Sequence, residues 1–131
     1  QKGQTVEAAG HLVQPAEVLG APRRGLSMVF AGDTAPCPAL EAAARGTDLL
    51  LCDATYALPE QEAQAKQWGH STFGQSAALA ARAGARRLWL THYSPMITDP
   101  EEQLPRAQGI FPAAECGFDG KSITLHYEEE A

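Results

Sequence analysis

The chain has 131 residues, of which 44% are hydrophobic and 20% are charged, values typical of one modest globular domain or of part of a larger one. No apolar run approaches the roughly 18 residues that a bilayer-spanning helix needs, so we expect no membrane partner. Ten basic and 16 acidic residues give a net charge of −6. This charge argues against non-specific nucleic-acid binding by this chain alone, because phosphate affinity comes largely from Lys and Arg.

Three cysteines stand far apart, at positions 37, 52 and 116. An odd number of cysteines without a C-x-x-C pair does not make a disulfide framework. Reduced cysteines are typical of an intracellular protein, and no signal peptide is recognisable, so we expect a cytoplasmic location. The chain begins at Gln1 rather than Met, so we also expect that its natural N-terminus lies upstream.

The first 25 residues are polar and rich in turn signals. Gly10, between Val6 and Val13, predicts a small hairpin. Residues 14–20 predict one helical turn that is closed by a glycine.

The rest of the chain alternates short apolar runs with helical segments. Buried strands are predicted at 27–31, 48–52 and 86–91, and an edge strand at 122–127. Helices are predicted at 38–45, 59–67, 71–83 and 101–111, the last of them interrupted by Pro105. This order predicts an α/β layer with crossover helices.

Each of the three buried strands is followed by a polar residue that can do chemistry, namely Asp33, Asp53 and His92. Because the carboxyl ends of parallel strands share one edge of a sheet, we expect these residues to converge there. Asp33 follows a glycine that lets a ligand approach closely, and its carboxylate suits a metal ion; a turn cap is the alternative. His92 carries the commonest metal-binding side chain; a purely structural histidine is the alternative.

His70 stands just before the helix predicted at 71–83. In that place it can act as a general acid or bind phosphate together with the helix N-terminus; an exposed loop histidine is the alternative. Asp53 can orient such a histidine, as carboxylates do in other sites, or can simply end its strand. His11 and His126 lack this context and are predicted to be surface residues.

Four segments of the chain form an ordered set. They are Gly-Asp-Thr-Ala-Pro at 32–36, Leu-Leu-Leu-Cys-Asp-Ala-Thr at 49–55, Gly-His-Ser-Thr at 69–72 and Leu-Thr-His-Tyr-Ser-Pro at 90–95. Together they resemble the C-terminal half of ribonuclease Z, the tRNA 3′-processing endonuclease of the metallo-β-lactamase fold. The resemblance runs from about Val6 to Leu125. It implies that residues 1–131 are the C-terminal portion of a metallo-β-lactamase (αββα) sandwich, an α/β fold with a mixed sheet flanked by helices.

The resemblance also implies a zinc-dependent phosphodiesterase that cleaves pre-tRNA 3′ trailers and works as a homodimer. Asp33 falls on the carboxylate that bridges two zinc ions, and His92 falls on a histidine that ligates one of them. His70 falls on the histidine of the His-Ser-Thr motif, which assists phosphodiester cleavage. Asp53 falls on the acid of the His-Glu-Ala-Thr motif, which pairs with that histidine.

The chain departs from the family pattern at three points. Ala35 stands where an Arg usually follows Gly-Asp-Thr, so one candidate phosphate contact is lost. Asp53 is one methylene shorter than the usual Glu, which leaves its pairing with His70 open. The His-x-His-x-Asp-His metal motif of the N-terminal half is absent from the sequence, so two zinc ions would lack ligands.

These departures define the partners and the alternatives. We expect the chain alone to be inactive and to need the missing N-terminal half of the same fold as its partner. One alternative function is a phosphodiesterase of the same superfamily that acts on small cyclic or aryl phosphodiesters. The other is a non-catalytic half-domain that serves as an interaction surface.

Overall fold

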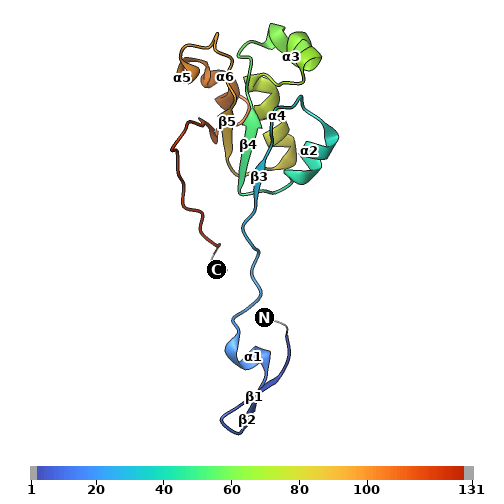
Figure 1. Cartoon of the computed structure of the whole chain (residues 1–131), viewed down its shortest axis with the longest axis vertical. Helices are drawn as coiled ribbons and strands as arrows, with labels where there is room; N and C mark the ends of the chain where they lie inside the picture. Colours follow the sequence, from blue (N-terminus) through green and yellow to red (C-terminus); the bar gives the residue numbers. More distant parts are fainter. Residues whose placement is uncertain (1–2, 129–131) are drawn as a thin grey trace. The chain divides into compact units, whose positions relative to one another are not determined.

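The structure is a computed structural model that describes residues 3–128 (Figure 1). It divides into two compact units, one made of the residues up to Gly25 with those from Tyr127 on, and one made of Leu26–His126. In the first unit, β1 (Val6–Ala8) pairs antiparallel with β2 (His11–Val13), and the single turn α1 (Pro15–Val18) follows. The predicted hairpin and helical turn are both confirmed.

The second unit is built on a four-stranded sheet in the order β3-β4-β5-β6. Its strands are β3 (Met28–Phe30), β4 (Leu49–Asp53), β5 (Leu88–Thr91) and β6 (Ala114–Cys116). All three pairings are parallel, and the strands β3, β4 and β5 confirm the three predicted buried strands.

The edge strand was predicted in the wrong place. Residues 122–127 form no strand, and the edge position next to β5 belongs to β6, where Ala114 lies opposite Leu88. The strand β6 alternates buried and exposed residues around Glu115, but three residues are too few for this alternation to predict a strand. Among the described residues 26–126, the four strands of the sheet are all parallel.

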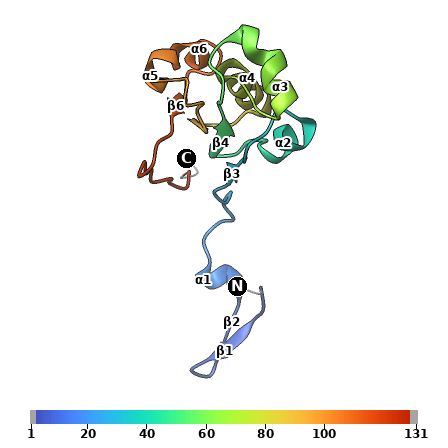
Figure 2. The same cartoon turned by 45° about the horizontal axis from the view of Figure 1, so that its top comes forward.

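The predicted helices are present. They are α2 (Pro38–Ala43), the 3₁₀ turn η1 (Pro59–Gln61) running into α3 (Glu62–Trp68), α4 (Phe73–Ala83), α5 (Pro100–Gln103) and α6 (Pro105–Gln108). The break between α5 and α6 falls at Pro105, which cannot donate a helical hydrogen bond. Helices α2, α4 and α6 cover one face of the sheet (Figure 2). None of the helices in the described range is long and apolar enough to cross a bilayer.

The core lies between the sheet and these helices. Leu50, Leu88 and Leu90 are fully buried there against Phe73 of α4. Side chains of alternate residues point to the other face of a strand, and on that face β3 exposes Met28 and Phe30. Phe30, Leu51 and Trp89 line a hollow of about 780 Å³ that extends to Asp33 and His92 at the ends of the strands.

The burial of two cysteines leads to a test of thiol reactivity. Cys52 and Cys116 are free and buried, and burial raises the pKa of both thiols, that of Cys116 to about 11. Since the thiolate is the reactive form, we expect iodoacetamide at pH 8 to alkylate them at least about 10-fold more slowly than the partly exposed Cys37. Peptide mass spectrometry gives the three rates, and the rates should become equal in denaturant. Fast alkylation of Cys116 in the folded protein would contradict this burial.

Candidate active site

The carboxyl ends of β3, β4 and β5 bring three chemically capable side chains to one rim. Asp33 follows β3, Asp53 is the last residue of β4, and His92 follows β5. Nε2 of His92 lies 3.1 Å from Oδ2 of Asp33, and its Nδ1 lies 3.7 Å from Oδ2 of Asp53. The predicted convergence is therefore confirmed.

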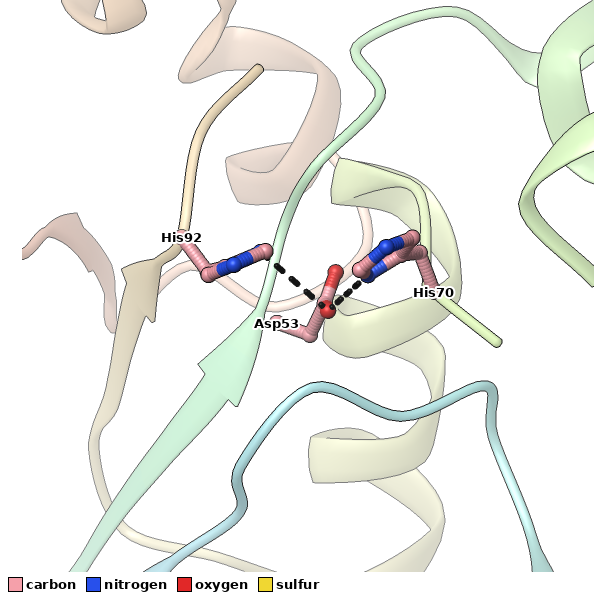
Figure 3. Close-up of side chains that lie close together, drawn as sticks. All are labelled: Asp53, His70 and His92. Atoms are coloured by element: carbon pink, nitrogen blue, oxygen red, sulfur yellow. Dashed lines mark hydrogen bonds and ion pairs between the residues drawn. The ribbon is translucent and has the colours of Figure 1, made fainter. Parts of the chain in front are cut away.

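His70 reaches the same rim from the connection between α3 and α4. Gly69 ends α3 in the left-handed conformation, with φ of 73°, and the His70 amide donates to the carbonyl of Ala65. Two residues later the Thr72 hydroxyl caps α4 by accepting from the amide of Gln75. The chain between these two caps is short, and it presents His70 to the end of β4 (Figure 3).

Asp53 is the centre of the site's hydrogen bonds and is completely buried. Its Oδ1 accepts from the backbone amides of Thr55 at 2.9 Å and Ser71 at 3.1 Å. Its Oδ2 lies 2.8 Å from Nδ1 of His70. Figure 3 marks this contact with a dashed line. These partners compensate the cost of burying a carboxylate. The pairing that the sequence leaves open is thus made, and the shorter acid reaches the histidine directly.

This pairing leaves one edge of the His70 ring available. Because Nδ1 is engaged by Asp53, Nε2 is free for another partner, and the His70 side chain is 20% exposed. The His70 and His92 rings are stacked, with centroids 5.1 Å apart and planes 18° apart. A group bound at Asp33 and His92 would therefore lie beside the His70 ring.

Two arrangements of the described residues could hold a metal ion. Ligand atoms of Asp53, His70 and His92 lie within 4.8 Å of one another. However, the oxygens of Asp53 already accept hydrogen bonds from inside the protein, which makes it a poor metal ligand. The carboxylate of Asp33 and Nε2 of His92 converge from half-exposed side chains and are both common zinc ligands, so this pair fits a metal ion better.

The sequence did not predict two of the contacts that build the site. The Ser71 hydroxyl donates to the carbonyl of Thr34 at 2.7 Å and so ties the Asp33 loop to the His70 loop. The Thr55 hydroxyl lies between Asp53 and His92, 2.9 Å from Oδ1 of the former and from Nδ1 of the latter. His11 and His126 are exposed, as predicted.

Comparisons with known proteins identify the class to which this fold and site belong. The β-lactamase superfamily domain matches residues 5–93. The crystal structure of the metallo-β-lactamase fold protein YhfI from Bacillus subtilis superposes with a TM-score of 0.61 over 70% of this chain and 35% of that one, at 20% identity. The chain belongs to the β-lactamase superfamily, and the predicted α/β fold class is confirmed. This superfamily fold implies the use of a divalent metal.

Within this superfamily, the chain is similar to ribonuclease Z. It is 41% identical to ribonuclease Z of Lachnoclostridium phytofermentans, covering 98% of this chain and 42% of that protein. It is 48% identical to ribonuclease Z of Methanosarcina acetivorans, covering 99% of this chain and 43% of that protein. The chain thus spans about two fifths of the length of these relatives, and the resemblance predicted from the motifs is confirmed.

Proposed function

We propose that the complete protein containing this chain is a zinc-dependent endoribonuclease that removes 3′ trailers from pre-tRNA. One observation carries the proposal: a hydrogen-bonded Asp53–His70 pair stands beside an Asp33–His92 pair on a single rim of the sheet. The similarity to ribonuclease Z from two organisms, across nearly the whole chain, supports it.

Asp33 and His92 would hold zinc together with ligands from the N-terminal half that this chain lacks. When bound, zinc supplies Lewis-acid chemistry, because it lowers the pKa of water and offsets negative charge on phosphate oxygens. Both side chains are open to such a partner, with exposed fractions of 59% for Asp33 and 46% for His92.

His70 would carry the proton chemistry. Asp53 fixes the ring by accepting from Nδ1, so Nε2 faces the place beside the stacked His92 ring where a substrate phosphate would lie. A protonated Nε2 in that position can donate to a phosphate oxygen or to the leaving oxygen as the ester bond breaks. The buried Asp53 does not touch the substrate and acts as a positioning residue.

The exposed face of β3 indicates where the N-terminal half of the fold would pack. Met28 and Phe30 are 62% and 68% exposed on the open face of β3, beside the hollow of about 780 Å³, and the N-terminal half would cover them. We further propose that the complete protein is a homodimer and that it is located in the cytoplasm. The three free cysteines support the cytoplasmic location, because cysteines stay reduced in that compartment.

The test uses the full-length protein, loaded with zinc or stripped by a chelator. Its substrates are a pre-tRNA with a 3′ trailer, the mature tRNA, and bis(p-nitrophenyl) phosphate. We expect the zinc-loaded protein to cleave the pre-tRNA at the 3′ end of its acceptor stem and to leave the mature tRNA uncut. Hydrolysis of the aryl diester without pre-tRNA cleavage would favour the small-phosphodiester alternative, which the loss of the Arg at Ala35 motivates. No hydrolysis of either substrate by the zinc-loaded protein would favour the non-catalytic alternative.

A further inference from the structure

We infer that the hydroxyl of Thr55 selects the tautomer of His92 in which Nδ1 carries the proton, and so leaves Nε2 as the nitrogen that binds metal. The inference rests on the proposed function only in treating His92 as a metal ligand. Thr55 is 8% exposed and would not touch the substrate, so it is a positioning residue.

The Thr55 hydroxyl has more partners than it has hydrogens to donate. Oγ1 of Thr55 has three partners: Oδ1 of Asp53 at 2.9 Å, the carbonyl of His92 at 3.0 Å and Nδ1 of His92 at 2.9 Å. A hydroxyl has one hydrogen to donate, and a carboxylate and a carbonyl can only accept. If that hydrogen went to Nδ1, both oxygens would face the lone pairs of the hydroxyl. When Nδ1 donates to Thr55 instead, the hydroxyl hydrogen is left for these two oxygens, so only this arrangement gives at least one of them a donor.

In the neutral ring, the other nitrogen then has no proton. In a neutral imidazole that donates through Nδ1, Nε2 carries the lone pair. This lone pair faces Oδ2 of Asp33 at 3.1 Å, so two electron-pair donors converge on one position that a cation can share. A hydrogen bond to the opposite nitrogen is the usual way in which proteins orient a metal-binding histidine.

Thr55 also holds the backbone of His92. His92 has φ of 60°, a left-handed conformation that is uncommon for a residue other than glycine. The His92 carbonyl is one of the partners of the Thr55 hydroxyl, and the amide of Ser94 donates to the Thr55 carbonyl at 3.1 Å. Thr55 is itself anchored, since its amide donates to Asp53. The ring and the backbone of His92 thus depend on the same side chain.

The experiment compares Thr55→Val, which keeps the shape and removes the hydroxyl, with Thr55→Ser, which keeps the hydroxyl. Both are made in the full-length protein. The His92 tautomer is measured at pH 8 from side-chain ¹⁵N shifts of the metal-free protein, with the signals assigned by their loss in His92→Gln. Zinc affinity is measured by competition with a chelator. We expect wild type and Thr55→Ser to hold the proton on Nδ1. Thr55→Val should populate the Nε2–H form and bind zinc about 10–100-fold more weakly.

Thr47→Val is the matched control. Thr47 is a buried threonine whose hydroxyl donates to the carbonyl of Ser27 at 3.0 Å. It precedes β4, whereas Thr55 follows β4 at the end that carries the site. It should lose stability as Thr55→Val does, without a change in tautomer or zinc affinity.

Several results would overturn the inference. A proton on Nε2 of His92 in the wild type would do so, even if Thr55→Val did not fold. So would an unchanged tautomer in Thr55→Val, or an equal loss of zinc affinity in the Thr47 and Thr55 valine variants. The proposed function can fail while the role of Thr55 stands. This would be the outcome if the zinc-loaded wild type did not cleave pre-tRNA but its metal-free form carried the proton on Nδ1 of His92.

Discussion

Asp33→Asn is expected to remove metal binding and cleavage from the complete protein while leaving it folded. The substitution takes away a negative charge and a strong oxygen ligand at the point where Nε2 of His92 converges. The Asp33 side chain is 59% exposed, so its loss should cost little stability. We expect the zinc content to fall by at least one ion per polypeptide and turnover to fall by more than about 100-fold.

Elemental analysis and pre-tRNA cleavage measure the two effects, and a denaturant titration checks the fold. Asp99→Asn serves as the control, because Asp99 is a carboxylate that caps α5 by accepting from the amide of Glu101, a role that Asn also fills. It should match the wild type in all three measurements. A full complement of zinc in Asp33→Asn would remove Asp33 from the set of metal ligands.

His70→Ala is expected to separate catalysis from metal binding. Its ring hydrogen-bonds to Asp53 and stacks on His92. Because its proposed role is proton transfer, we expect turnover to fall by about 10²–10⁴-fold with the zinc content unchanged. His126→Ala, which removes an exposed histidine, should behave as the wild type. Unchanged turnover in His70→Ala would contradict the catalytic role.

A double variant tests whether Asp53 acts through His70. Asp53→Asn keeps the size of the side chain but disturbs the acceptor that orients Nδ1 of His70. Residues that act as a unit are not additive, so the double variant with His70→Ala should be no slower than His70→Ala alone. A further large drop would mean that Asp53 has a second role in the reaction. The unfolding free energy of each variant must be measured alongside, since Asp53 is completely buried.

Much of the fold could be predicted because its signals are local. Leu49, Leu50 and Leu51 mark the central strand β4, and Gly84 marks the end of α4 in the left-handed conformation. The strand β6 could not be predicted, because its three residues become a strand only through pairing with β5. Residues 122–127, where an edge strand was predicted, form no strand.

By itself, the sequence determined which chemical groups stand at the strand ends and which motifs resemble ribonuclease Z. Asp33, Asp53 and His92 follow from strand boundaries, and parallel strands necessarily bring them to one rim. Only the tertiary structure decided how these groups pair. The 2.8 Å contact between His70 and Asp53 joins residues 17 positions apart. The contact between the Thr55 hydroxyl and the His92 ring joins residues 37 positions apart. Hydrogen bonds of this kind depend on distances that arise when the strands and caps pack, and no local pattern of residues encodes them.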